Sequence, residues 1–127
     1  LTAENAMVRA ITVNITNDGP KVALQRMREE EVSVLLAVDK TRQYQGYITA
    51  DDALQLLNRG EKSLTSILKN DMPIVTSTTV LQDILSIISD SPTPVAVVDD
   101  GKLRGVLIRG VIIEALASTN QGGDSNE

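Results

Sequence analysis

A threonine and an aspartate stand where a predicted strand gives way to a predicted helix, in the segment Gly46-Tyr47-Ile48-Thr49-Ala50-Asp51-Asp52. A threonine hydroxyl can donate a hydrogen bond to a phosphate, and a carboxylate can accept from the two hydroxyls of a ribose. Thr49 and Asp52 therefore have the chemistry of a nucleoside site. The same Thr-x-x-Asp spacing also suits a helix start, with Thr49 as the N-cap and the carboxylate near the positive end of the helix. Both interpretations stay open at this point.

The composition excludes several kinds of chemistry. The chain has no Cys and no His, so it lacks the residues for disulfides, thiolate nucleophiles, imidazole bases and the usual zinc sites. Residues 105–110 contain two glycines but have neither the Walker spacing nor a lysine. We therefore predict no catalytic residues and no enzyme activity. The net charge of -5 disfavours nucleic acid as a partner, because phosphate neutralisation needs clustered Lys and Arg.

The remaining charged groups have simpler interpretations. Asp51-Asp52 and Asp99-Asp100 suggest a divalent metal site, but the second pair precedes Gly101 in a predicted turn, where Asp is common for conformational reasons. We expect no metal site. A cationic surface could attract an anionic membrane at about 1 kcal/mol per basic residue, with ordinary solubilising charge as the alternative. The basic residues in question are Arg9, Arg59, Lys62 and Lys69.

The elements that position this polar segment occur twice. The string AVDKTRQYQGYITADDALQLL returns in altered form as VVDDGKLRGVLIRGVIIEAL, which indicates an internal duplication. Asp39 aligns with Asp99 at an offset of 60 residues, and one deletion in the following turn places Gly46 on Gly105 at an offset of 59. We assign residues 1–60 to repeat 1, residues 61–118 to repeat 2 and residues 119–127 to a flexible acidic tail.

Each repeat is predicted to fold as β-α-β-β-α. In repeat 1 the turn Asn17-Asp18-Gly19-Pro20 starts a helix whose apolar face holds Val22, Ala23 and Met27. Gly60 ends the second helix of that repeat. The other elements are expected at residues 12–15, 34–38, 44–49 and 50–58 in repeat 1, at 64–68 in the joint, and at 74–76, 80–89, 95–98, 103–108 and 109–118 in repeat 2.

The two repeats are expected to need each other. A lone unit of about sixty residues buries only ~60% of its unfolded surface and is marginally stable. We therefore predict a mixed α/β (α+β) fold in which the repeats cover each other's sheets with pseudo-twofold symmetry.

The duplication and the Gly-hydrophobic-hydrophobic-Thr-x-x-Asp ending resemble the cystathionine-β-synthase (CBS) domain, whose tandem pairs bind adenosine derivatives. The resemblance assigns phosphate contact to Thr49 and ribose contact to Asp52. Repeat 2 departs from the pattern, because Ile108 replaces the Thr and Val111 replaces the Asp, so a nucleotide is not expected there in the family's usual way. Arg109 could instead bind a different phosphate ligand, or it is a solvated arginine at a helix start, where its charge is unfavourable.

Longer stretches resemble the C-terminal regulatory region of the ATP-binding subunits of glycine betaine/proline ABC transporters. They are TVNITNDGPKVALQRMREEEVSVLLAVDK, GYITADDAL and PVAVVDDGKLRGVLIRGVIIEAL. The resemblance implies a cytoplasmic regulatory pair, attached to an ATPase domain and to membrane transporter subunits at the inner face of the cell membrane. In some of these transporters cyclic di-AMP is held where second repeats meet across a homodimer, which would place beside the ligand Thr93, Val95, Val106, Ile108 and Arg109.

Two functions follow as hypotheses. The first is a regulatory module that needs no cofactor, senses cyclic di-AMP, AMP or ATP, and gates osmoprotectant transport. The alternative is a ligand-free dimerisation module that senses ionic strength through its charged surface, since salt screens charges over about 8 Å at 0.15 M.

Overall fold

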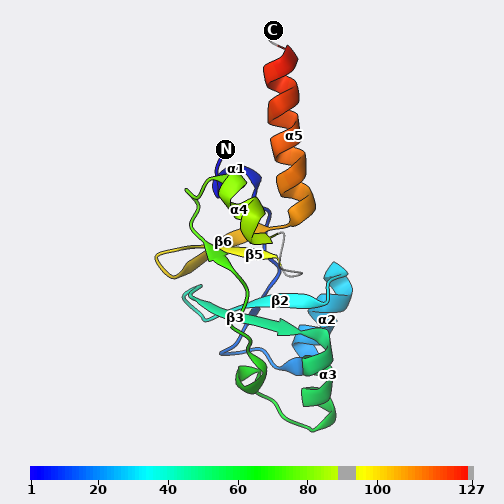
Figure 1. Cartoon of the computed structure of the whole chain (residues 1–127). Helices are drawn as coiled ribbons and strands as arrows, with labels where there is room; N and C mark the ends of the chain where they lie inside the picture. The colour runs from blue at the N-terminus through cyan, green and yellow to red at the C-terminus, as the bar shows by residue number, and fades with distance from the viewer. Residues whose placement is uncertain (89–93, 126–127) are drawn as a thin grey trace. The chain divides into compact units, whose positions relative to one another are not determined.

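The computed structural model describes residues 1–88 and 94–125, with side chains described as far as Ser118. It has a mixed α/β fold with two three-stranded sheets and their helices (Figure 1). The strand order is β1-β2-β3 in one sheet and β4-β5-β6 in the other. The predicted fold class is therefore confirmed. Within the described ranges, no helix combines the length and the apolar character needed to cross a membrane.

The chain forms two compact units that interleave along the sequence. The first unit contains Ala10–Met72 and Gly101–Leu103; the second contains Leu1–Arg9, Pro73–Asp100 and Arg104–Glu127. The predicted boundary at residue 60 marks the repeats of the sequence, whereas the spatial units exchange their leading segments. Residues ahead of repeat 1 pack with repeat 2, and the joint ahead of β4 packs with repeat 1.

The sheet of the first unit is formed by three strands, of which β2 and β3 are labelled in Figure 1. β1 (Thr12–Asn14) pairs in parallel with β2 (Val34–Val38), and β2 pairs antiparallel with β3 (Tyr44–Thr49). The pairing of β2 with β3 shifts between Ala37 and Val38. The bounds of β2 and β3 are those predicted from their apolar runs. Four successive residues of β2 are buried, so both faces of this strand are covered.

Two α-helices and one 3₁₀ helix belong to this unit, and Figure 1 labels α2 and α3. α2 (Pro20–Glu30) begins after the N-cap Gly19, as the turn predicts, and its buried residues include Ala23 and Met27. Val22 was expected on the same apolar face, but it is 39% exposed, because one residue turns a helix by about 100°. α3 (Ala50–Asn58) has the predicted bounds, and η1 (Thr65–Ile67) replaces the short helix expected in the joint.

Capping residues explain where α3 begins and ends. Thr49 is its N-cap and Arg59 its C-cap, and Gly60 follows with φ 74°, the left-handed conformation that ends many helices. The hydrophobic core of the unit lies between the sheet and the helices α2 and α3. Its buried residues are Val13, Ala23, Met27, Leu35, Ala37, Ile48, Leu56 and Leu64.

The second unit repeats this plan. β4 (Ile74–Val75) pairs in parallel with β5 (Val95–Asp99), β6 (Lys102–Leu107) completes the sheet, and α4 (Leu81–Ile88) lies between β4 and β5 in the chain. These elements lie within two residues of their predicted bounds. The buried cluster of this unit consists of Ala3, Ala6, Val75, Leu81, Ile84, Ile88, Val95, Val97, Leu107 and Ile112.

Two helices of this unit differ from expectation. α1 (Ala3–Ala6) was not predicted, because four residues are too few for a periodic apolar signal; its two alanines are buried in the second core. α5 (Arg109–Ser125) continues past the predicted end at residue 118. No proline follows that position, so nothing in the backbone forbids further helical turns. The flexibility expected for residues 119–127 stays a prediction.

Candidate functional site

Thr49 stands at the corner where β3 ends and α3 begins. Its Oγ1 accepts a hydrogen bond from the backbone N–H of Asp52 at 3.3 Å, so the N-cap interpretation is confirmed. The side chain is half-buried. A threonine hydroxyl has one donor and two lone pairs, so accepting this bond leaves the hydroxyl able to donate to a ligand oxygen.

Asp52 lies in the first turn of α3, next to the exposed Asp51. Its Oδ2 is 3.7 Å from Nζ of Lys69, and the two side chains are 32% and 46% exposed respectively. An exposed ion pair of this length contributes about 0–1 kcal/mol. Asp52, the candidate ribose ligand, therefore forms an ion pair with Lys69 that can be broken at little cost in free energy.

The backbone of Lys69 runs along the outer edge of β3. Tyr47 N donates to Lys69 O at 3.0 Å, and Lys69 N donates to Tyr47 O at 2.9 Å. This close approach depends on Gly46, which has φ 119°; a Cβ there would collide with the Lys69 carbonyl oxygen and lie 2.8 Å from Asn70 Oδ1. The glycine lets the segment after η1 reach the corner at Thr49 and Asp52.

Two tyrosines and a carboxylate surround this segment. The Tyr47 hydroxyl donates to Asp71 Oδ1 at 2.6 Å. This bond and burial raise the pKa of Tyr47 to about 12, and the same bond holds the pKa of Asp71 below its usual value. The Tyr44 hydroxyl is buried and has no hydrogen-bond partner within the described part of the chain. Burial, followed by the negative charge of Asp71, raises the pKa of Tyr44 to about 12.

This environment of Asp52 was not predicted from the sequence. Lys69 was expected only in a cationic surface, and Tyr47 and Asp71 had no expected role. One signal was available: a glycine inside a strand often marks the close approach of another backbone. Gly46 is such a residue, but the sequence does not name the segment that approaches.

The candidate residues of repeat 2 lie in the second unit and have different surroundings. Val95 is fully buried in the core, and Val106 is 7% exposed and exchanges backbone hydrogen bonds with Val8 at 2.9 and 3.0 Å. Ile108 is 49% exposed, and Arg109, the first residue of α5, is also exposed. Ile108 and Arg109 are therefore available to a ligand as side chains. Thr93 lies outside the described residues.

The start of α5 differs electrostatically from the start of α3. Ile108 occupies the position that Thr49 holds in repeat 1, and its carbonyl accepts from the N–H of Ile112 at 3.1 Å. The first turn of α5 contains no acidic residue, whereas that of α3 contains two. The corner of repeat 1 is thus acidic, and the corner of repeat 2 combines the helix dipole with the Arg109 cation, which favours an anion.

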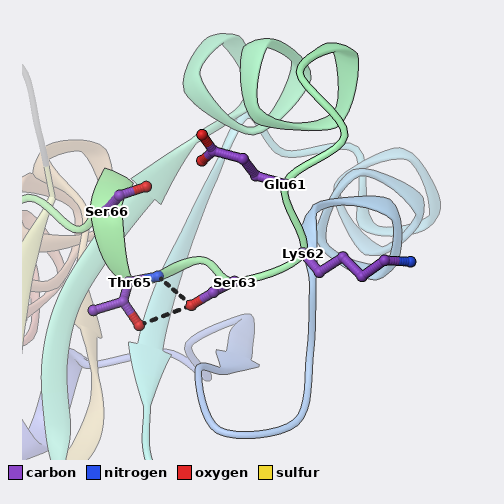
Figure 2. Close-up of a pocket in the computed structure, with 5 residues that line it drawn as sticks. All are labelled: Glu61, Lys62, Ser63, Thr65 and Ser66. Carbon is purple, nitrogen blue, oxygen red and sulfur yellow. Dashed lines mark hydrogen bonds between the residues drawn. The ribbon is translucent and has the colours of Figure 1, made fainter.

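A shallow, open depression of about 490 Å³ lies elsewhere in the first unit, after α3 (Figure 2). Ser63 Oγ accepts a hydrogen bond from Thr65 N at 3.3 Å and donates one to Thr65 Oγ1 at 3.1 Å. In Figure 2 the side chains of Glu61 and Lys62 point in different directions. The polar groups of the depression do not converge on one point. Its lining residues are Glu61, Lys62, Ser63, Thr65 and Ser66.

The four basic residues considered for a cationic surface do not share one environment. Arg9 belongs to the second unit and the other three to the first. Arg59 lies 3.8 Å from a Glu61 carboxylate oxygen, and Lys69 pairs with Asp52. Among the described residues, no group of three or more acidic side chains could hold a metal ion.

Comparison with known families decides what kind of module this is. The sequence profile of the CBS domain matches residues 3–59 and, a second time, residues 64–118. The chain belongs to the CBS domain family. The two matches also confirm that the duplication visible in the sequence is a pair of CBS domains.

Transport proteins contain similar CBS pairs. The glycine betaine/carnitine transport ATP-binding protein GbuA of Listeria monocytogenes serotype 1/2a (strain 10403S) is 40% identical over 116 residues, 91% of this chain and 29% of that protein. The glycine betaine transport ATP-binding protein OpuAA of Bacillus subtilis (strain 168) is 39% identical over 122 residues, 95% of this chain and 29% of that protein. This chain therefore spans less than a third of each relative. The predicted resemblance to glycine betaine transport subunits is confirmed.

Solved structures share the fold. Staphylococcus aureus OpuCA is 27% identical with a TM-score of 0.78, covering 90% of this chain and 97% of that one. CBSX2, solved in complex with AMP, is 22% identical with a TM-score of 0.78 over 94% of this chain and 98% of that one. CbpB, solved in complex with c-di-AMP, is 16% identical with a TM-score of 0.79 over 100% of this chain and 91% of that one. At these low identities the last two establish the fold alone.

Proposed function

We propose that this CBS pair is the regulatory part of an ATP-binding subunit of an osmoprotectant (glycine betaine/proline) ABC transporter. It binds a nucleotide such as cyclic di-AMP, AMP or ATP and thereby gates transport at the cytoplasmic face of the membrane. Its partners are the attached ATPase domain and the transporter subunits in the membrane. The observation that carries this proposal is the similarity of nearly the whole chain to two glycine betaine transport proteins.

The corner at Thr49 and Asp52 supports nucleotide binding in repeat 1. The partly exposed carboxylate of Asp52 and the hydroxyl of the N-cap Thr49 lie in the first turn of one strand-to-helix junction, which suits a ribose and its phosphate. CBSX2 and CbpB, which share this fold, have been solved with AMP and with c-di-AMP respectively. The proposal transfers this ligand class to the present chain.

Calorimetric titration of the chain with AMP, ATP and cyclic di-AMP at physiological salt tests the proposal. We expect heat beyond dilution for at least one of them. Asp52→Asn should weaken AMP binding by about tenfold or more, the cost of losing a charge-assisted hydrogen bond. Asp51→Asn is the matched control, because it removes the same charge from the neighbouring exposed position. Heats equal to dilution for all three nucleotides would refute ligand sensing.

Arg109 separates the two functional hypotheses. If cyclic di-AMP binds at repeat 2, Arg109→Ala should abolish its binding. The residues proposed to lie beside the ligand there are Thr93, Val95, Val106, Ile108 and Arg109. If the chain is a ligand-free sensor of ionic strength, no nucleotide binds and the variant keeps its salt response. The exposed ion pairs Arg59–Glu61 and Lys69–Asp52 are the groups that salt would screen in that second case.

A homodimer is also part of the proposal. α2 and α3 pack together in the first unit and leave three large apolar side chains exposed: Val22 at 39%, Leu54 at 50% and Leu57 at 39%. Such side chains suit a second copy of the same helix pair. Sedimentation across a concentration series should show a dimer that Leu54→Glu dissociates and the exposed control Gln55→Glu preserves. A wild-type monomer at all concentrations would refute this part.

We further propose that the fragment does not hydrolyse ATP. It lacks the phosphate-binding loop of a transport ATPase and any imidazole or thiol. A phosphate-release assay on the isolated chain should read as buffer, and measurable turnover that survives repurification would contradict this.

A further inference from the structure

Lys69 lies on the same side of the sheet edge as the residues proposed to bind the nucleotide. Tyr47 and Thr49 are two positions apart in β3, so their side chains point to the same face. Lys69 is the hydrogen-bonded partner of Tyr47 across the edge, and directly opposed residues also share a face. The contact between the Tyr47 hydroxyl and Asp71, two residues beyond Lys69, agrees with this assignment.

The ammonium group of Lys69 can serve both halves of the corner. It already lies 3.7 Å from Asp52. Two strand residues span about 7 Å, so the four-carbon stem of lysine can carry the charge from a point opposite Tyr47 toward Thr49. The pair with Asp52 is long and half exposed, and such a pair is easily broken.

The corner would repel a phosphate without this cation. Asp51 and Asp52 occupy the first turn of α3, and Asp71 lies beside the same edge of β3. A neutral nucleoside meets no such penalty, because its ribose hydroxyls donate to Asp52 while it brings no negative charge. The charges of these carboxylates and of Lys69 should therefore change the affinity for a phosphorylated nucleoside more than the affinity for the nucleoside itself.

We infer that Lys69 determines specificity for phosphorylated nucleosides: the ribose hydroxyls replace it on Asp52, and the released ammonium pairs with the phosphate. This inference rests on the proposed nucleotide site at Thr49 and Asp52 and deepens it. In the unliganded chain Lys69 is paired with Asp52, so a ribose must displace it from that carboxylate. In the complex it compensates the charge of the ligand.

The test compares AMP with adenosine, because the two differ only in the phosphate. The wild-type chain should bind AMP more tightly than adenosine. Lys69→Met keeps the stem and the backbone bridge to Tyr47 but removes the charge, so AMP affinity should fall about tenfold. Adenosine affinity should stay equal or rise, because a competitor for Asp52 is lost. Lys69→Arg should retain the preference for AMP.

Lys40→Met is the matched control. Lys40 is an exposed lysine in the turn between β2 and β3 of the same unit, so this variant changes the net charge equally. It should keep the wild-type ratio of AMP to adenosine affinity. A matching thermal unfolding midpoint for the two variants would show that both are folded.

Three results would overturn the inference, and they are distinguishable. If neither AMP nor adenosine binds the wild-type chain, the proposed site at Thr49 and Asp52 fails and the role of Lys69 fails with it. If both bind and Lys69→Met leaves their affinity ratio unchanged, the site stands and the role of Lys69 is refuted. If Lys40→Met lowers the ratio as much as Lys69→Met, the preference reflects overall charge instead of Lys69.

Discussion

Replacing Gly46 with alanine should disrupt the candidate site and the fold together. The residue has φ 119°, a conformation that L side chains rarely adopt, and the added Cβ would collide with the Lys69 carbonyl oxygen. That oxygen accepts a hydrogen bond from Tyr47, and the Lys69 N–H donates one back. The single methyl group therefore acts on the strand and on the segment that pairs with its edge.

The expected cost follows from two contributions. Backbone strain in a conformation reserved for glycine costs about 1–3 kcal/mol. Displacing the Lys69 segment weakens two backbone hydrogen bonds, each contributing about 1 kcal/mol. We expect Gly46→Ala to lower the free energy of unfolding by about 3 kcal/mol, a large part of the roughly 5–15 kcal/mol typical of a domain. The melting temperature should fall by about 10 °C.

Two other glycines serve as controls for the same substitution. Gly60 has φ 74°, but no heavy atom lies within 4 Å of the place that an alanine methyl group would take, so Gly60→Ala should cost only about 1 kcal/mol of conformational strain. Gly110 lies inside α5 and is equally open, so Gly110→Ala should be neutral or stabilise by up to about 1 kcal/mol. Urea denaturation followed by circular dichroism would rank the three variants. Equal costs at Gly46 and Gly60 would refute the role assigned to the Lys69 contact.

Three further predictions concern titration and packing. Tyr44 and Tyr47 should titrate near pH 12 instead of 10, Tyr44 because it is buried and Tyr47 because it donates a hydrogen bond to a carboxylate. Their contribution to the free energy of unfolding is complete below pH 10 and is lost as the pH rises through 12. The chain has no Trp, so tyrosinate absorbance reads this directly, and titration near pH 10 in the folded chain would contradict it. A backbone N–H from residue 77 donates to Asp99 at 3.0 Å and lowers its pKa below 3.8, so its contribution is present above about pH 4 and is lost in stronger acid; Asp99→Asn should flatten the acid side of a stability-against-pH curve, and an unchanged curve would count against it. Leu56 is fully buried and Leu54 is 50% exposed on the same helix, so Leu56→Ala should cost about 3 kcal/mol in urea denaturation and Leu54→Ala below about 1; similar costs would show that the assigned core is wrong.

Local sequence patterns were sufficient to predict most of the elements. The apolar run of β2 and the strand-to-helix corner at Thr49 have unambiguous signals, because the run is too short for a helix and the corner carries an N-cap residue. Gly60 likewise ends α3 for a conformational reason that the sequence displays. Repetition of the pattern then located the elements of the second copy.

Contacts between distant segments were not predictable in this way. Lys69 lies 22 residues beyond Tyr47, and nothing in the residues between them specifies that their backbones pair. α1 is invisible to periodicity, and its place in the second core depends on Ala3 and Ala6, two small residues with no distinctive pattern. The ion pair of Asp52 was missed for the same reason, since Lys69 reaches Asp52 through tertiary structure.

The exchange of leading segments bears on what happens when the two repeats are separated. Val8 pairs with Val106 in the second unit and Lys69 pairs with Tyr47 in the first, so each sheet is finished by residues that precede the other repeat's first strand. Cutting the chain at residue 60 would therefore remove from each sheet the segment that pairs with its outer strand.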